Sequence, residues 1–270
     1  MSHDPYKTLK LQHPIRIRLL EVARVTELGP SMRRITLRGD LADFVSASFD
    51  DHVKLVLPET PGAKPSLPTL TATGLVFDET RPRPAMRDYT PRRYDAQGGE
   101  LDIDFVMHHD GPATDWARHA QPGHLLGTAG PRGSLVIPDI FDWHLLIGDE
   151  TAIPAIARRL EELPAGSRAI VRIRITREDG KLPLQANGPL DIQWLVGEPG
   201  DAASGAGVLE SAVRQLTLPD GEGHAWAAGE YSEIKALRRH LVELHGMDKS
   251  RVRAASYWRR ASPATHERFE

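Results

Sequence analysis

Cysteine is absent from the sequence. The chain therefore cannot form disulfides, bind a metal through thiolates, ligate an iron–sulfur cluster through cysteine or use a thiol nucleophile. Any redox chemistry that the protein performs needs a cofactor taken up from outside the chain.

Long hydrophobic runs and excess positive charge are missing too. No stretch approaches the roughly 18 apolar residues of a membrane span, and the N-terminus lacks the apolar core of a signal peptide. Lys+Arg 34 against Asp+Glu 37 gives a formal charge of -3, which excludes a global basic field for nucleic acid. We expect a cytoplasmic protein without membrane or nucleic-acid partners, in which any basic site is local.

The first half of the chain carries short runs typical of strands. At 40% hydrophobic and 26% charged residues, the 270-residue chain is an ordinary globular protein, long enough for two domains. Polar and apolar side chains alternate at 15–22, 32–38, 52–57 and 101–107, which predicts an antiparallel barrel or sandwich. A short helix entered through glycine and proline is expected at 111–120.

After about position 141 strands alternate with helices. We expect a strand, a turn and a helix over 143–163, then strands at 169–175, 192–196, 224–230 and 251–258. Helices are expected at 204–216 and 231–246. This alternation predicts a mostly parallel sheet covered on both faces. The expected domains are 1–140 and 141–270.

The segment R-D-Y-T at 87–90 supplies groups that suit a flavin dinucleotide. In a strand, Arg87 and Tyr89 project to one face and Thr90 to the other. A flavin needs an aromatic stack, an arginine for its pyrophosphate and a small hydrogen-bond partner at a ring nitrogen. The first turn of the helix that begins at G-P-A-T (111–114) would offer amides to the same phosphates. A barrel followed by a nucleotide-type unit favours one ligand on each domain, with the reaction at their junction.

Taken singly, these motifs have ordinary structural explanations. R-D-Y-T also fits an edge strand with a surface arginine and a half-buried tyrosine. G-D-E-T-A (148–152) fits a strand-to-helix turn capped by Asp149 or Thr151. The histidines have no metal-ligand spacing, so no protein metal site is predicted.

The motifs together resemble a known family. R-D-Y-T is similar to the R-x-Y-[ST] flavin signature of the ferredoxin-reductase-like superfamily, whose fold is an antiparallel Greek-key β-barrel followed by an α/β domain. The chain more narrowly resembles the siderophore-interacting proteins, which are FAD-dependent ferric-siderophore reductases. The motifs that carry this resemblance are F-V-M-H-H-D-G-P-A-T-D-W-A (105–117), G-P-R-G (130–133), G-D-E-T-A-I-P-A-I (148–156), A-G-E (228–230) and S-Y-W-R-R (256–260).

The resemblance implies a role for each motif. In the flavin site, Arg87 would hold the pyrophosphate, Tyr89 would stack on the isoalloxazine and Thr90 would approach its N5. The remaining cofactor-binding residues that it implies are His108, Ala113 and Thr114 for the flavin, Gly148, Asp149, Glu150, Thr151 and Ala152 for the nicotinamide dinucleotide, Gly229 and Glu230 beside the nicotinamide, and Tyr257 and Trp258 close to the flavin. The basic residues implied for the iron chelate are Lys54, Arg132 and Arg259.

Two departures from the family pattern affect these expectations. His109 stands where the family often has glycine, which alters the backbone freedom beside the flavin. Arg172, Arg174 and Arg177 crowd one strand and its exit, where relatives commonly have an acidic residue near Arg174. Because an arginine accommodates a ribose 2′-phosphate, this cluster favours NADPH over NADH. Which of the three arginines faces the ribose stays open; Arg174 and Arg177 are taken as cofactor-binding, and Arg177 lies at the strand end where ligands gather.

The expected function is therefore FAD-dependent reduction of a ferric siderophore by NADPH, with NADH as the alternative donor. Flavin converts a two-electron donor into one-electron steps, so the protein needs no acid or base of its own. Two other functions stay open: a siderophore carrier without redox activity, and a flavin reductase that serves a partner ferredoxin. A monomer is expected.

Overall fold

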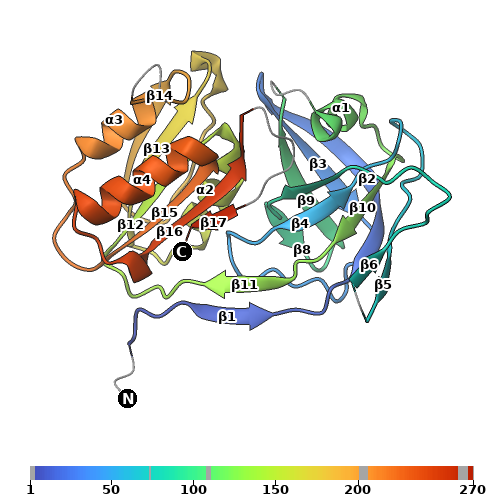
Figure 1. Ribbon diagram of the computed structural model, residues 1–270, viewed down its shortest axis with the longest axis horizontal. Coiled ribbons are helices and arrows are strands. Elements are labelled where there is room, and N and C mark those ends of the chain that lie inside the picture. The colour runs from blue at the N-terminus through green and yellow to red at the C-terminus, as the bar shows by residue number, and fades with distance from the viewer. Residues whose placement is uncertain (1–3, 73, 108–110, 201–205, 261–266, 270) are drawn as a thin grey trace. The chain divides into compact units, whose positions relative to one another are not determined.

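The computed structural model describes residues 4–72, 74–107, 111–200, 206–260 and 267–269 (Figure 1). The chain forms two compact units. One is Leu9–Val136, and the other joins Ile137–Glu270 with the N-terminal segment that ends at Thr8. The sequence predicts a division near 138–143, but it does not predict that the N-terminal segment packs with the second unit.

The first unit is built on an antiparallel sheet of seven strands. Their order is β7-β4-β10-β2-β3-β9-β8, so the late strand β10 lies between two early ones, as in a Greek key. The predicted antiparallel fold is confirmed. The strands are β2 (Ile17–Gly29), β3 (Met32–Arg38), β4 (Val53–Val56), β7 (Met86–Tyr89), β8 (Arg93–Asp95), β9 (Glu100–Val106) and β10 (Leu125–Ala129).

Alternation along these strands creates a single core for the unit. Every second residue of β9, including Leu101, Ile103 and Phe105, is buried against inward side chains of the neighbouring strands. Helix α1 (Pro112–His119) covers this core with Trp116 and Ala117. The helix predicted at 111–120 is thus present, and its apolar face explains its position.

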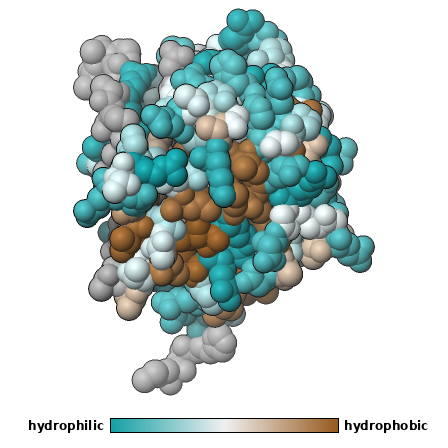
Figure 2. Space-filling view, turned by 90° about the vertical axis from the view of Figure 1, so that its right-hand side faces the viewer, coloured by the Kyte–Doolittle hydropathy of each residue, from teal (hydrophilic) through white to brown (hydrophobic). Residues whose placement is uncertain are grey.

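Shorter strands complete the first unit. β1 (Leu9–Gln12) pairs with β11 (Gly133–Val136), and β5 (Thr69–Thr71) pairs with β6 (Gly74–Val76). The sequence does not predict them, because three or four residues are too few to establish a period. Leu70 and Val76 are exposed on the β5–β6 hairpin. Figure 2 shows one face of the molecule, on which apolar side chains gather within a hydrophilic border.

The second unit contains a mostly parallel sheet, as predicted. Its order is β14-β13-β12-β15-β16-β17, and only β17 (Glu267–Phe269) runs antiparallel. The direction of winding reverses between β12 and β15, which are neighbours in the sheet. The parallel strands are β12 (Trp143–Asp149), β13 (Arg168–Ile175), β14 (Leu190–Val196), β15 (Gly223–Glu230) and β16 (Val252–Trp258).

Helices cover both faces of this sheet and connect its parallel strands. The 3-10 turn η1 (Glu150–Ala152) leads directly into α2 (Ile153–Glu162). Helices α3 (Val208–Arg214) and α4 (Tyr231–Glu243) lie side by side on one face (Figure 1). Right-handed crossovers place α2, which precedes the reversal of strand order, on the opposite face. The connections also contain the 3-10 turns η2 (Glu178–Gly180) and η3 (Lys249–Arg251).

Two histidines are buried at the amino ends of the central strands. His144 of β12 and His224 of β15 are register partners with ring centroids 6.4 Å apart, and Phe141 packs on both. The ring of Tyr6, in the N-terminal segment, packs on Phe141 at 5.1 Å. Burial, reinforced by the charge of Arg159, lowers the pKa of His144 to about 3. Burial also lowers the pKa of His224 well below its ordinary value, so both rings are neutral at pH 7.

Candidate functional site

The edge strand β7 presents Arg87 and Tyr89 on one face of its sheet. Their register partners on β4 are Leu55 and Val53, which both point into the core. The predicted shared orientation of Arg87 and Tyr89 is therefore confirmed by the ladder. One face of the Tyr89 ring packs on Phe105, with centroids 4.5 Å apart. Burial raises the pKa of the Tyr89 phenol, against the opposing effect of Arg87, so the hydroxyl keeps its proton.

Arg87 keeps most of its donors available. Its Nη1 donates to the carbonyl of the preceding Met86 at 2.8 Å, and this is its one hydrogen bond to a described residue. A half-buried guanidinium with unused donors suits a phosphate, which it can bind through two oxygens. Thr90 follows directly after β7 and is buried.

The start of α1 offers backbone amides. Its N-cap is Gly111, which has no side chain to cap the helix, and Pro112 has no N–H. The first hydrogen bond within the helix runs from Asp115 N to Gly111 O at 2.9 Å. The amides of Ala113 and Thr114 come before it and donate no hydrogen bond within the helix. The Thr114 hydroxyl donates to Val106 O at 3.3 Å, so this residue can serve an anion through its amide. His108, predicted beside this turn, lies outside the described residues.

The opposite face of β4 and β7 carries an ion pair. Lys54 Nζ lies 2.7 Å from Asp88 Oδ1, and the two are register partners. The Lys54 side chain is 49% exposed and the Asp88 side chain 16%. Lys54 is also the register partner of Ala129 on β10, and Arg132 follows three residues later with its side chain exposed. The structure thus brings Lys54 and Arg132 to one end of this unit, whereas Arg259 belongs to the other unit.

In the second unit, the carboxyl ends of four parallel strands meet around Asp149. This carboxylate is almost fully buried and accepts five hydrogen bonds. Oδ1 accepts from Thr151 N at 2.9 Å and Thr151 Oγ1 at 2.5 Å. Oδ2 accepts from Glu230 N at 3.1 Å, Trp258 Nε1 at 2.8 Å and Arg174 Nη2 at 3.3 Å. Asp149 therefore joins β12, β13, β15 and β16 at the reversal of strand order, where open α/β sheets bind ligands.

Two glycines allow these strand ends to pack closely. A Cβ on Gly148 would lie 2.4 Å from Ala152 Cβ and 2.6 Å from Ala228 O. A Cβ on Gly229, whose φ is 152°, would lie 2.7 Å from Asp149 Oδ2. Larger residues at these two positions would separate β12 from β15, so this close packing requires glycine.

Glu150 and Thr176 connect the turn after β12 to the end of β13. Glu150 is buried, and its Oε1 accepts from both Thr176 N and Thr176 Oγ1 at 3.0 Å. The next residue, Arg177, is 71% exposed and forms an ion pair with Asp179 at 2.8 Å. Of the predicted ribose-phosphate residues, Arg177 therefore presents its guanidinium to solvent at the carboxyl end of β13.

Arg174 is placed differently from the expectation for a phosphate ligand. It is 2% exposed, and its Nε donates to Glu233 Oε2 at 3.1 Å while Nη2 reaches Asp149. A guanidinium enclosed between two carboxylates does not present a face to a ribose phosphate. Side chains of β13 point alternately to the two faces of the sheet, so Arg174 points to the face that α3 and α4 cover, as Ile170 and Arg172 do.

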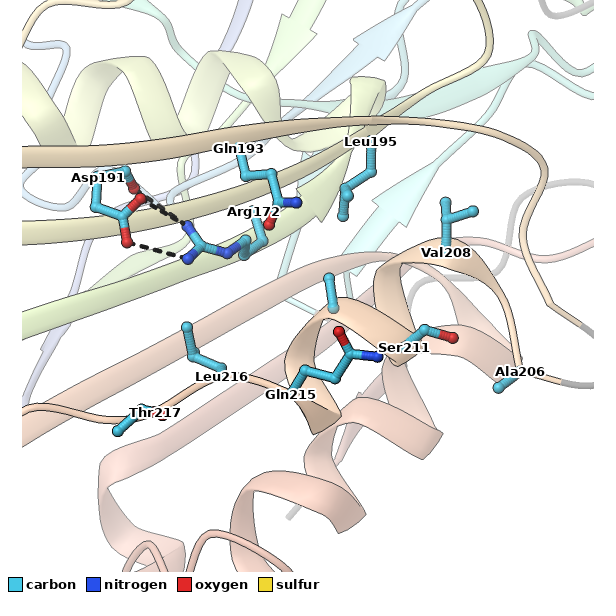
Figure 3. A pocket seen from close by; sticks show the side chains of 11 residues that line it. Arg172, Asp191, Gln193, Leu195, Ala206, Val208, Ser211, Gln215, Leu216 and Thr217 are labelled. Atoms are coloured by element: carbon cyan, nitrogen blue, oxygen red, sulfur yellow. Dashed lines mark hydrogen bonds and ion pairs between the residues drawn. The ribbon is translucent and has the colours of Figure 1, made fainter.

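Arg172 lies beside a cavity of about 580 Å³ between β14 and α3 (Figure 3). Its Nη2 donates to Asp191 Oδ2 at 3.0 Å, so its charge is balanced at the cavity wall. Gln193, Gln215 and Ser211 also line this space. The cavity lies along the strands rather than at their carboxyl ends. Of the predicted cofactor-binding residues that the structure describes, none lines it.

The remaining predicted residues of this unit lie near the end of β16. Tyr257 makes an edge contact with Trp226, with centroids 6.3 Å apart. The guanidinium of Arg259 stacks over the ring of Tyr231 at 3.7 Å. Glu230 caps α4, because its Oε2 accepts from Ser232 N at 2.7 Å and from Glu233 N at 3.1 Å.

Comparison with known proteins places the whole chain in one family. The family model described as "Siderophore-interacting FAD-binding domain" matches residues 21–135, and that described as "Siderophore-interacting protein" matches residues 141–261. The NADPH-dependent ferric-chelate reductase of Escherichia coli (strain K12) is 37% identical over 96% of this chain and 99% of its own. The chain belongs to the siderophore-interacting protein family.

Other relatives of this siderophore-interacting protein agree with the assignment. The ferric vibriobactin reductase ViuB of Vibrio cholerae is 34% identical over 93% of each chain. The crystal structure of a siderophore utilization protein from T. fusca matches with a TM-score of 0.84 and 36% identity, covering 95% of this chain and 97% of that one.

Sequence reasoning missed two charged residues of this siderophore-interacting protein. Asp88, inside R-D-Y-T, is the partner of Lys54. Glu233 is buried against Arg174, and burial raises its pKa to about 7, with Arg174 opposing and Asp149 and Glu230 adding to the rise. The spacing E-Y-S-E at 230–233 resembles a capping box, and that signal could have marked Glu233 as the third residue of a capped helix.

Across the described part of the chain, no group of three His, Cys, Asp or Glu residues is arranged to hold a metal ion. Within the same residues, no helix combines the length and the apolarity needed to cross a bilayer.

Proposed function

We propose that this siderophore-interacting protein is an FAD-dependent reductase that takes electrons from NADPH and reduces Fe(III) held in a siderophore. The observation that carries the proposal is the match to the FAD-binding family model over the strand that presents Arg87 and Tyr89. The Escherichia coli relative, named NADPH-dependent ferric-chelate reductase, supports the donor and the class of substrate. Ferric vibriobactin, in the name of the Vibrio cholerae relative, supports a siderophore as the chelate.

The residues of the first unit fit FAD. Arg87 would bind the pyrophosphate through its unused donors, together with the amides of Ala113 and Thr114 at the start of α1. Tyr89 would cover the isoalloxazine with the ring face opposite Phe105, and Thr90 would lie at its edge. When bound, FAD supplies the conversion of a two-electron donor into one-electron steps.

The residues of the second unit fit a dinucleotide at the reversal of strand order. The turn Gly148–Ala152 and the backbone at Gly229 would border it, and Arg177 would bind the 2′-phosphate that distinguishes NADPH from NADH. Arg177 would exchange its exposed partner Asp179 for the phosphate, at little cost because a surface ion pair contributes only about 0–1 kcal/mol. Asp149, Glu150 and Arg174 would act by holding the strand ends rather than by touching the ligand.

The chelated iron is substrate, and the protein contributes binding and orientation. Lys54, Arg132 and Arg259 would attract an anionic ferric chelate despite the net charge of -3. No side chain has to act as acid or base, because the reaction transfers electrons to iron. We also propose that the protein is a cytoplasmic monomer. Ferredoxin remains a second candidate electron donor, to be compared with NADPH.

A visible spectrum tests the function directly. The purified protein should be yellow, with flavin absorbance that bleaches when NADPH is added without oxygen and returns when a ferric siderophore follows. NADH should bleach it more slowly at the same concentration, because it lacks the 2′-phosphate. A colourless protein that binds ferric siderophores would instead be a carrier. If reduced ferredoxin bleaches the flavin and NADPH does not, ferredoxin is the electron donor.

Asp88→Asn should strengthen binding of anionic ferric chelates. The Asp88 carboxylate competes with the chelate for Lys54, so its removal should lower the KM for an anionic chelate about two- to fivefold. The KM for a neutral chelate should not change. Steady-state kinetics with both chelates measure this ratio, and Glu27→Gln, which removes an exposed carboxylate paired with Arg33 in the same unit, is the control. An unchanged ratio would remove Lys54 from the substrate site.

A further inference from the structure

Glu233 and Asp149 share one buried guanidinium. Arg174 donates from Nε to Glu233 Oε2 at 3.1 Å and from Nη2 to Asp149 Oδ2 at 3.3 Å. The same Asp149 oxygen accepts the indole N–H of Trp258 at 2.8 Å. Arg174, Asp149 and Glu233 are each 2–3% exposed, so water does not screen these contacts. A change in the attraction between Glu233 and Arg174 therefore alters the Arg174–Asp149 hydrogen bond, and with it the Asp149–Trp258 hydrogen bond.

The cluster contains more carboxyl groups than cations. Asp149 of β12 and Glu233 in the first turn of α4 face Arg174, and Glu230, at the end of β15, accepts the backbone amide of Glu233. Excess negative charge in a buried site is costly, and adding a proton to one carboxyl group relieves it. A proton is therefore expected on the carboxyl group that the protein satisfies least.

Hydrogen bonding identifies Glu233 as that group. Asp149 accepts five donors, and Glu230 accepts the amides of Ser232, Glu233 and Arg260. Glu233 accepts only from Arg174, and its Oε1 has no hydrogen-bond partner among the described residues. Burial raises its pKa to about 7, opposed by Arg174 and supported by Asp149 and Glu230, which agrees with this placement of the proton.

We propose that Glu233 is a positioning residue, and that its gain or loss of a proton redistributes Arg174 between Glu233 and Asp149 and so adjusts how firmly Trp258 is held. When Glu233 is ionised it draws Arg174 away, and Asp149 relies more on the Trp258 N–H. When Glu233 takes a proton from water, Arg174 turns to Asp149 and the indole hydrogen bond weakens. The inference rests on the proposed function only in that Gly229 would border the dinucleotide, next to Glu230, whose amide donates to the same Asp149 oxygen.

The indole N–H resonance of Trp258 tests this step without any cofactor turnover. The sequence has five tryptophans, and Trp258→Phe identifies the signal that belongs to Trp258 in ¹⁵N-labelled full-length protein. Between about pH 6 and pH 8 that signal should move along a single titration curve with a midpoint near 7. In Glu233→Gln, which cannot ionise, it should stay in place while the other indole signals report an intact fold.

A matched control separates Glu233 from any other carboxyl group. Glu210 accepts from His240 at 2.6 Å in the same unit but makes no bond to Arg174 or Asp149. Glu210→Gln should therefore leave the titration of the Trp258 signal unchanged. A Trp258 signal that does not move in the wild type, or that titrates equally in Glu233→Gln, overturns the proposal. Should Glu233→Gln fail to fold, Glu233→Asp replaces it: this variant keeps the charge on a shorter side chain and should shift the midpoint of the Trp258 titration, and an unshifted midpoint overturns the proposal.

The enzyme provides a second measurement. The pH profile of the KM for NADPH should lose its inflection near 7 in Glu233→Gln, whereas a merely structural role would lower activity equally at every pH. If the wild type does not oxidise NADPH at all, the proposed function fails while the indole titration still reports on Glu233. If NADPH is oxidised and neither readout depends on Glu233, the inference fails and the function stands.

Discussion

Arg87→Ala should yield a folded protein that loses its FAD. Hydrogen bonds between a charged donor and a phosphate contribute about 1.5–3 kcal/mol, so one lost contact should weaken FAD binding roughly 10- to 100-fold. The fold should survive, because Arg87 makes one hydrogen bond, to its own neighbour Met86, and leaves no buried partner behind. The ratio of flavin to protein absorbance after purification and an FAD titration of the apoprotein measure the effect.

Arg24→Ala is the control for this experiment. It removes the same charge from the same unit but breaks only a surface pair with Glu100. FAD should remain bound to Arg24→Ala. If both variants keep their FAD, Arg87 does not bind the pyrophosphate, and the edge-strand explanation of R-D-Y-T is sufficient.

Acid should destabilise the second unit through its buried histidines. Because the pKa of His144 is about 3 in the folded protein and near 6.5 in the unfolded chain, the unfolded chain takes up a proton first as the pH falls. Stability present above pH 6.5 is therefore lost on acidification, by about 1.4 kcal/mol per pH unit for His144, and His224 acts in the same direction. His144 alone should account for about 2 kcal/mol between pH 7 and pH 5.

Comparison with His144→Phe isolates this contribution. Glu233 has a raised pKa, so its contribution to stability grows as the pH falls from 7 to 5 and opposes that of the histidines. Wild type and His144→Phe share Glu233, and the difference between their urea unfolding free energies should change by about 2 kcal/mol over this range. His119→Gln, at an exposed position on α1, should follow the wild type. A pH-independent difference would mean that His144 takes up its proton in the folded state.

The sequence predicts the strands and helices that have clear periods, together with the motifs at their ends. R-D-Y-T and G-D-E-T-A are short segments whose geometry follows from local chain direction, so the orientation of Arg87 and Tyr89 could be derived. Short strands such as β5 and β6 contain too few residues for a pattern. The packing of Tyr6 on Phe141 joins two residues of the second unit that are separated in the sequence by the whole first unit, and no local pattern can express such a contact.

The arginines of β13 illustrate why the site could be predicted only in part. Arg172, Arg174 and Arg177 look equivalent in the sequence, but each has a different partner. Arg172 binds Asp191 on the neighbouring strand, Arg174 binds Glu233 on a helix 59 residues away, and Arg177 binds Asp179 two residues along. Composition shows how many cations are present. Tertiary pairing decides which of them remain accessible to a phosphate.

The pairing of β1 with β11 brings together the two ends of the first unit. Leu9 and Val136, the first and last residues of that unit, occupy the same rung of the ladder. The chain therefore enters and leaves the first unit at a single place, an arrangement that tolerates circular permutation and insertion into another chain.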